Sequence, residues 1–291
     1  MLVGLSQQPA GYVVSVNNRH NSLIREENLQ PVTVYGASAW YCVGVLVLGI
    51  ETSSRVGKVA LFEDGCTLAQ AKSEEPNAHG ERILALVGSV FEQSGRQRTA
   101  LTHIAVGRGP GAFTGLRIGL AVAQGLAIGL GIPVVGVGSL RAMAAGLPIS
   151  SDVARVCLLD ARRGELFVAC YAVDGKELSA PHAIARGSLR SALAAEFAKL
   201  ATLPQQPSVT EAVLVGAVLG ELAADELSLE PIGDTRLGVH RSPETDYPGA
   251  VAVCQLAYEG VHLESPTPDY QRDADAIIPN LPPCPLDRAK S

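Results

Sequence analysis

One segment constrains the fold more than any other, because it joins an apolar strand-like run to a long apolar helix through a glycine-rich loop. The run is Leu101–Val106, the loop is Gly107–Thr114, and the helix is Gly115–Leu130, with Gly131 as its stop. In α/β proteins, loops that lead from a strand into a helix are where ligands are placed. The segment therefore predicts an α/β fold and makes this loop a candidate for a site.

The first half of the chain continues this alternation of strands and helices. Three β-rich runs form a predicted meander, a helical period follows, and a strand and a short helix come after the long helix. These elements are strands Val45–Glu51, Val56–Phe62 and Cys66–Ser73, helix Gly80–Ser94, strand Pro133–Val137 and helix Ser139–Gly146.

The second half opens in the same way, with paired strands and then alternating helices and strands, as a duplicated α/β unit would. Its predicted elements are strands Val153–Asp160 and Glu165–Ala172, a hairpin turn at Asp174-Gly175, helix Ser188–Leu200, strand Ala212–Val215 and helices Ala217–Glu226 and Pro248–Leu263. We expect a first lobe over 45–150, a second lobe with the C-terminal helix over 151–264, and an irregular Pro-rich tail over 265–291.

Residues 1–44 differ from the rest, because they carry scattered polar residues and no sustained period of 2 or 3.6. One interpretation is a disordered extension. The other is a mis-assigned start, since Val43 and Val45 precede the first clear strand and valine codons can serve as alternative starts.

Composition excludes several classes of protein. Lys and Arg number 23 against 29 Asp and Glu, a net charge of −6, whereas a free-standing nucleic-acid binder usually has a basic excess. The six cysteines form no CxxC pair, which favours reduced thiols in a cytoplasmic protein over disulfides or a zinc site. The longest apolar run has fifteen residues, which is short for a membrane span.

The glycine-rich loop has two interpretations. Its glycines suit a tight turn, Thr114 suits a helix cap, and Phe113 and Ile118 suit a hydrophobic staple. That account leaves Arg108 and Arg117 near a helix N-terminus, where cations oppose the helix dipole. They indicate an anion site or a partner's carboxylate, formed with Gly109, Gly111 and Thr114. The loop lacks the Lys-Ser/Thr of a phosphate-binding Walker loop.

Helix Gly115–Leu130 carries a stripe of small residues four apart, at Gly115, Gly119, Ala123 and Ala127. Such a stripe lets another backbone approach closely. It could pack on the protein's own sheet or meet a partner's helix, and the sequence leaves both open.

Two polar segments could face a cleft between the lobes. Glu51, Thr52 and Ser53 end the first strand, where a carboxylate and hydroxyls can hold a metal-bound phosphate or form an ordinary turn. Asp160, Arg162 and Arg163 belong to a charged hairpin at the start of the second lobe.

Taken together, these segments resemble the bacterial TsaB (YeaZ) family. The matching stretches are LGIETSS at 48–54, HGERIL at 79–84, the long stretch 105–140, LLDARRGEL at 158–166 and, weakly, PDYQR at 268–272. The resemblance covers roughly 45–272. Two departures are Glu51 where the family usually has Asp, and Gln271 where it usually has Leu.

The resemblance implies an actin-like, RNase-H-like fold of two lobes, of the ASKHA superfamily. It also implies a cytoplasmic role in making N6-threonylcarbamoyladenosine beside the anticodon of tRNAs that read codons beginning with A. In that pathway TsaD transfers the group, TsaB is its paralogous partner, and the ATPase TsaE joins them. The resemblance thus implies contact with tRNA through the complex and no association with a membrane. A weak homodimer could use the partner's surface.

The family pairs through helices of its first lobe. Carried over, the partner-binding helix face consists of Ile83 and Val87 together with Gly115, Gly119, Ala123 and Ala127.

The same comparison predicts that the chain is not an enzyme. TsaD continues from its Gly-Pro-Gly loop and next strand into a metal-binding HxxxH, whereas Val137–Met143 contains no His, Asp or Glu. We therefore expect no catalytic residue, no metal and no cofactor of the chain's own, although a nucleotide at the interface of the complex stays open. The alternatives are an ATPase or kinase of the same fold and, less favoured, a metallopeptidase.

Overall fold

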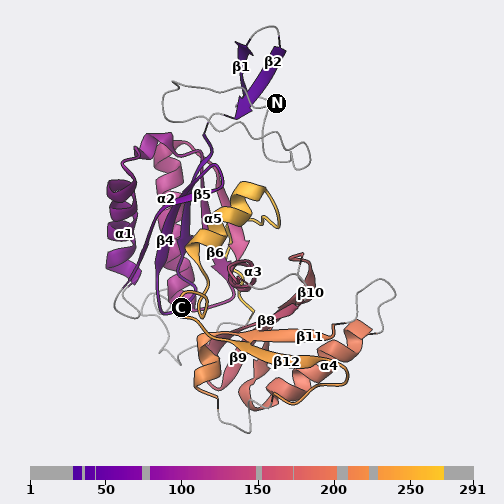
Figure 1. Ribbon diagram of the computed structural model, residues 1–291. Coiled ribbons are helices and arrows are strands. Elements are labelled where there is room, and N and C mark those ends of the chain that lie inside the picture. Colours follow the sequence, from indigo (N-terminus) through magenta and orange to yellow (C-terminus); the bar gives the residue numbers. More distant parts are fainter. Residues whose placement is uncertain are drawn as a thin grey trace, which may run out of the picture.

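The computed structural model of the protein describes residues 29–34, 37–42, 44–73, 79–148, 153–172, 174–201, 209–222 and 229–271. Two five-stranded sheets, one above the other in Figure 1, form two lobes within the described chain. A separate antiparallel hairpin of β1 (Leu29–Val34) and β2 (Ala37–Cys42) precedes them. The sequence analysis did not predict this hairpin.

The first sheet has the strand order β5-β4-β3-β6-β7. Its strands are β3 (Leu46–Glu51), β4 (Lys58–Glu63), β5 (Cys66–Lys72), β6 (His103–Gly109) and β7 (Val134–Gly138). The first three form an antiparallel meander, and β6 and β7 continue parallel to β3. The predicted first-lobe strands are therefore confirmed.

The second sheet has the order β10-β9-β8-β11-β12. Its strands are β8 (Ala154–Arg162), β9 (Glu165–Tyr171), β10 (Glu177–Ala185), β11 (Glu211–Val215) and β12 (Arg236–His240). Here too an antiparallel meander is followed by two parallel strands. The two lobes thus repeat one topology, which confirms the duplicated α/β unit predicted from the sequence pattern and the two-lobed, actin-like fold that the resemblance implied.

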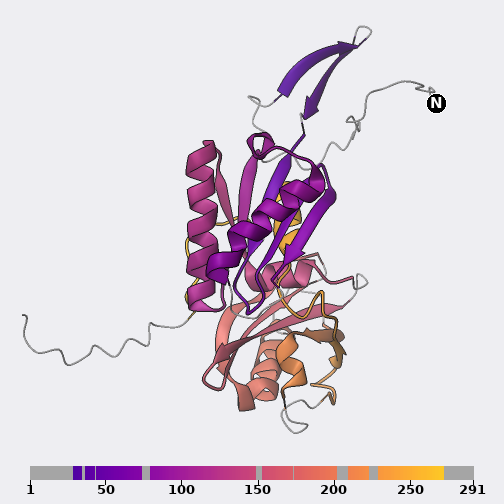
Figure 2. The same cartoon turned by 90° about the vertical axis from the view of Figure 1, so that its left-hand side faces the viewer.

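Helices cover both faces of the first sheet. Helices α1 (His79–Ser94) and α2 (Phe113–Leu130) pack on one face around Leu48, Ile50 and Val106. Figure 2 shows both helices on the same side of the sheet. Helix α5 (Ala250–Glu259) covers the other face against Val47, Ala60 and Phe62. The sequence analysis expected this C-terminal helix in the second lobe. It belongs to the first lobe instead, because the chain crosses back to the first sheet after β12.

Helix α3 (Ser139–Ala145) connects the two lobes. Its residues Leu140 and Met143 are buried against Leu159, Phe167 and Tyr171 of the second sheet. The opposite face of that sheet is covered by α4 (Leu189–Ala201) and the short 3₁₀ helix Ala217–Gly220. The lobes therefore share a buried apolar contact through α3.

The second lobe also departs from the sequence prediction at its edges. Strand β10 was missed because it contains Pro181 and has irregular register, features that edge strands tolerate. Strand β12 was missed because it is short and only half-buried, with Gly238 in its middle. The helix expected at Ala217–Glu226 is a single 3₁₀ turn among the described residues.

Candidate functional site

The polar centre of the first lobe is the side chain of Glu51, which is fully buried at the end of β3. Its carboxylate accepts a hydrogen bond from the backbone N–H of Ser53 (2.6 Å) and another from the hydroxyl of Ser139 (3.0 Å). Burial raises the pKa of this carboxyl above its ordinary value, although the hydrogen bonds from Ser53 and Ser139 act in the opposite direction. Glu51 therefore links β3 to the start of α3 and does not line the cleft.

The glycine-rich loop is shaped by close contacts with this centre. A Cβ on Gly107 would lie 2.0 Å from a Glu51 carboxylate oxygen, and one on Gly111 would lie 2.3 Å from the Ser53 carbonyl oxygen. Gly109 has φ 110°, a left-handed value that favours glycine, and its N–H donates to the Ser139 hydroxyl (3.2 Å). The loop thus lies directly on the Glu51–Ser53 turn.

Helix α2 begins two residues earlier than a Thr114 cap requires. The helix starts at Phe113 with Ala112 as its N-cap and without a side-chain cap, so the predicted roles of Thr114 and of the Phe113–Ile118 staple are wrong. The turn is instead held by the backbone N–H of Ala112, which donates to the Ser53 carbonyl (2.6 Å).

The stripe of small residues faces inward. Gly115, Gly119, Ala123 and Ala127 are all buried, and a Cβ on Gly119 would lie 2.2 Å from the Thr52 hydroxyl. The alternative in which the stripe packs on the protein's own sheet is the one found.

The predicted partner-binding helix face is corrected as a consequence. Ile83 and Val87 of α1 are 1% and 3% exposed and belong to the same core as Ala123 and Ala127. With Gly115 and Gly119 also buried, none of the six residues can meet a partner while the lobe stays folded. Periodicity identified the apolar residues of both helices, and the structure buries the predicted set in the core of the first lobe.

The solvent side of these two helices carries a different set of small and apolar residues, which we call the outer α1/α2 face. Its members are Leu84, Ala85 and Gly88 of α1 and Ala121, Gly125 and Ile128 of α2. Leu84 is 55% exposed and Ile128 is 83% exposed.

By length and composition α2 could cross a membrane, but a third of its eighteen residues are buried within the lobe.

The two arginines of the predicted anion site contact the chain's own tail. Arg108 forms an ion pair with Glu264 and donates from Nε to the Thr267 carbonyl (2.9 Å), while the Arg108 carbonyl accepts from the Asp269 N–H (2.8 Å). Arg117 donates from Nε to the Tyr270 hydroxyl (3.0 Å). Residues 264–271, which we call the tail segment, therefore occupy the surface beside the loop.

Of the residues predicted to face a cleft between the lobes, the structure brings only some together. A cavity of about 150 Å³ between the lobes is lined by Ser53 from the first lobe and by Asp160 and Arg162 from the second. Thr52 is buried behind it and donates to the Gly115 carbonyl, and Arg163 lies in the hairpin turn with φ 53°. Ser53 Oγ is buried without a hydrogen-bond partner in the described structure.

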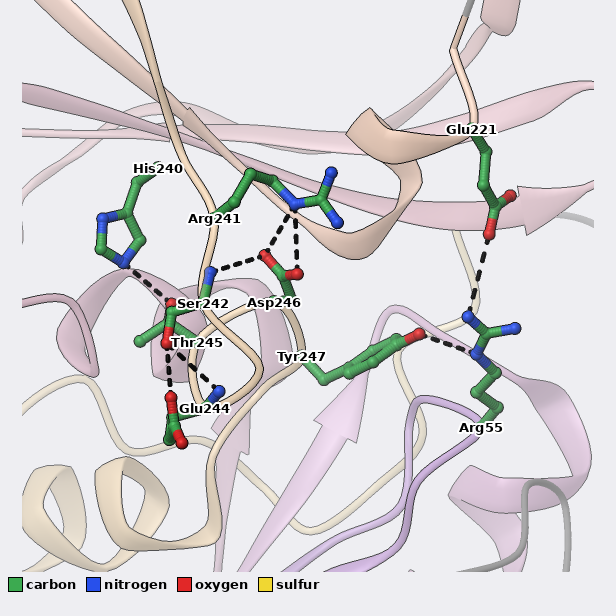
Figure 3. A network of polar contacts seen from close by, with 9 residues as sticks. All are labelled: Arg55, Glu221, His240, Arg241, Ser242, Glu244, Thr245, Asp246 and Tyr247. Carbon is green, nitrogen blue, oxygen red and sulfur yellow. Dashed lines mark hydrogen bonds and ion pairs between the residues drawn. The ribbon is translucent and has the colours of Figure 1, made fainter.

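Three residues that the sequence analysis missed complete this cleft. Arg55 Nε donates to the Tyr247 hydroxyl (2.7 Å), and its guanidinium lies 3.8 Å from the Glu221 carboxylate, as Figure 3 shows. No local pattern marks them, because they come from three separate segments.

The segment that returns from β12 to α5 joins the lobes across the cleft. Asp246 accepts hydrogen bonds from Arg241 Nε and from the Ser242 N–H (Figure 3), while its carbonyl accepts from Ala217 N–H of the second lobe. Lys58 Nζ of the first lobe donates to the Tyr247 carbonyl (3.1 Å) and to that of Glu244 (3.2 Å). Burial lowers the pKa of Lys58 to about 8.

Metal-ligating side chains do not gather in this part of the molecule. No three His, Cys, Asp or Glu side chains in the described ranges lie close enough to hold a metal ion. Around Val137–Met143, Ser139 bonds to Glu51, and Leu140, Ala142 and Met143 are core residues.

Known proteins resemble this chain in sequence and structure. A family model described as TsaD, tRNA N6-adenosine threonylcarbamoyltransferase, matches residues 73–222, just over half of the chain. The tRNA threonylcarbamoyladenosine biosynthesis protein TsaB of Escherichia coli is 41% identical over 129 residues, which cover 44% of this chain and 55% of that protein. An uncharacterized protein of Mycobacterium bovis is 34% identical over 182 residues, which cover 60% of this chain and 84% of that protein.

Among solved structures, YeaZ from Pseudomonas aeruginosa superimposes with a TM-score of 0.60 at 24% identity, over 78% of this chain and 99% of that one. This likeness shows the fold. The matched segments span about half the length of the curated TsaB relatives from E. coli, Haemophilus influenzae and Bacillus subtilis. The sequence matches place the chain in the TsaB family, within the wider group that the TsaD model describes.

Proposed function

We propose that the chain is a non-catalytic partner subunit of a cytoplasmic, TsaD-containing complex that installs N6-threonylcarbamoyladenosine next to the anticodon of tRNAs reading codons beginning with A. In this proposal TsaE joins the pair and tRNA is reached through the complex. The observation that carries it, beside membership of the family, is the outer α1/α2 face. Leu84 and Ile128, which are 55% and 83% exposed, lie with small residues on the solvent side of two helices in contact, and a contiguous apolar patch of this kind marks interaction surfaces.

Two features of the site support a role without catalysis. The Glu51 carboxyl is buried and already hydrogen-bonded to Ser53 and Ser139, so it is directed away from any ligand in the cleft. In the stretch 137–143, where the resemblance to TsaD would place metal ligands, Val137, Leu140, Ala142 and Met143 are core residues instead.

The main alternative is an ATPase or kinase of the same fold, with a nucleotide between the lobes. The cavity there holds about 150 Å³, below the ~300–1,000 Å³ of typical small-molecule pockets. The glycine-rich loop also lies in direct contact with the Ser53 backbone, which leaves little room for a phosphate. The geometry therefore favours the partner role, in which a nucleotide bound by the complex would lie at the interface with TsaD.

The test is co-expression with the TsaD of the same organism, followed by size-exclusion chromatography and mass spectrometry of the tRNA. We expect a one-to-one complex and threonylcarbamoyladenosine that depends on this chain. Modification that proceeds equally without the chain, with no complex formed, would overturn the proposal. Calorimetry of the lone chain with ATP tests the alternative, which predicts saturable binding.

A further inference from the structure

The tail segment builds an exposed cluster of three side chains at the start of α2, which we call the aromatic–arginine cluster. Phe113 and Tyr270 are 45% and 43% exposed, and their ring centroids are 5.1 Å apart. The guanidinium carbon of Arg117 lies 3.8 Å from the centre of the Phe113 ring. Residues 157 positions apart in the sequence thus form one surface.

The cluster is held in a fixed geometry. Arg117 donates to the Tyr270 hydroxyl, and the residues before Tyr270 are fixed by Arg108 and by Gln124, whose amide donates to the Pro266 carbonyl (3.1 Å). Side chains already fixed in place lose little conformational entropy when a partner binds. The cluster is therefore preorganised for binding.

Its composition is that of an interaction hot spot. Aromatic residues and arginine are enriched at the energetically dominant positions of protein interfaces. Two large rings that are nearly half exposed are not explained by the core, since the stack they form lies outside it. The cluster sits on α2, the same helix that carries the outer α1/α2 face.

Charge indicates what the partner offers. Within the described ranges, no carboxylate lies within ion-pair distance of Arg117, whereas Arg108 is paired with Glu264. Arg117 is the fifth residue of α2, just beyond the first turn and near the positively polarised N-terminal end of the helix. A carboxylate on the partner would form the ion pair that Arg117 lacks within the described ranges, and it would face the positive end of the helix.

We infer that the aromatic–arginine cluster is an anchor point for the partner protein, which places a carboxylate on Arg117 and apolar side chains against Phe113 and Tyr270. This inference rests on the proposed function and adds the tail segment to the interaction surface. An unstacked RNA base is the other ligand that such rings attract. The net charge of −6 and the nearby Asp269 favour a protein, since RNA affinity depends on several cations.

The test is a calorimetric titration of the full chain and its variants with purified TsaD from the same organism. We expect Arg117→Glu to weaken binding by about 30-fold or more, and Phe113→Ala by about tenfold. Tyr270→Phe, which keeps the ring and removes the hydrogen bond to Arg117, should weaken it severalfold. Lys176→Glu, an exposed charge reversal in the second lobe, is the matched control and should bind within about twofold of wild type.

Several outcomes separate this inference from the proposed function. If the wild-type chain does not bind TsaD, the proposed function fails. If it binds and the folded Arg117→Glu, Phe113→Ala and Tyr270→Phe variants bind equally well, the anchor is overturned while the partner role stands. Equal TsaD affinity with weaker tRNA binding by the complex would assign the cluster to RNA instead.

The carboxylate is tested by charge exchange. Acidic residues on the partner are reversed to lysine one at a time and titrated with the Arg117→Glu chain. Recovery of at least about tenfold in affinity for one pair supports a direct contact. If no reversal restores binding, the partner's carboxylate is refuted.

Discussion

The hydroxyl of Thr52 donates a 2.8 Å hydrogen bond to the backbone carbonyl of Gly115, which ties the end of β3 to the first turn of α2. The approach is close enough that only glycine fits one turn later, at Gly119. This contact accounts for glycine at position 119, while Ala123 and Ala127 of the inward stripe pack in the core of the first lobe.

Alanine at Gly119 should therefore destabilise the protein. Its Cβ would lie 2.2 Å from the Thr52 hydroxyl, so Gly119→Ala is expected to lower the free energy of unfolding by about 1–3 kcal/mol. The matched control is Gly125→Ala on the exposed side, where a Cβ meets nothing within 4 Å and helix propensity adds about 0.5–1 kcal/mol. Urea unfolding of both variants measures the contrast, and equal effects would contradict the close contact.

Replacing the buried carboxyl of Glu51 by an amide should change how stability depends on pH. Because the folded pKa lies above 4.5, the folded state binds the proton more tightly, and this stabilisation is lost as pH rises through the folded pKa. We expect the free energy of unfolding of Glu51→Gln, measured with urea, to rise relative to that of the wild type as pH rises from 5 to 8. Glu51→Ala should lower the free energy of unfolding by about 1–3 kcal/mol over the whole pH range, because it leaves the Ser53 N–H and the Ser139 hydroxyl without their acceptor. A Glu51→Gln difference that does not vary with pH would contradict the raised pKa.

Lys58 should make the free energy of unfolding rise with pH in the alkaline range, which is opposite in sign to the effect of Glu51. Its pKa is lowered to about 8, mainly by burial, from an ordinary value of 10.5. Between these values the unfolded chain holds a proton that the folded protein has released, so stability rises with pH. We expect Lys58→Met to flatten that rise in urea unfolding between pH 8 and 10.5, with Lys176→Met behaving as wild type. An unchanged slope in Lys58→Met would show that Lys58 is not its source.

The outer α1/α2 face can be tested without harming the core. Ile128 is 83% exposed, so Ile128→Glu should leave the melting temperature within about 2 °C and reduce TsaD affinity by about tenfold or more. Lys176→Glu, an exposed charge reversal in the second lobe, controls for a change of charge. Affinity unaffected by Ile128→Glu in a chain that binds TsaD would place the interface elsewhere.

Much of the fold could be read from local sequence. Alternating and continuous apolar runs predicted β3 to β9 and β11, and the helical spacing of Ile83, Val87 and Val90 predicted α1. The edge strands β10 and β12 escaped because an edge strand is half-exposed and needs no regular apolar pattern, as Pro181 and Gly238 illustrate.

The candidate site was predicted less completely. The sequence singled out Glu51, the glycine-rich loop and Arg117 as unusual. It could not show that Arg108 meets Glu264 or that Tyr270 stacks on Phe113, because more than 150 residues separate the members of each pair.

The sequence by itself determined the order of strands and helices, the glycine-rich turn and the family, because these depend on patterns within a few residues. Only the tertiary structure decided that the small-residue stripe faces inward, that α5 returns to the first sheet and that the tail segment completes a surface on α2. A helical period identifies which residues share a side of a helix. Which of two apolar sides is buried depends on how the whole sheet and its helices pack, and distant segments decide that.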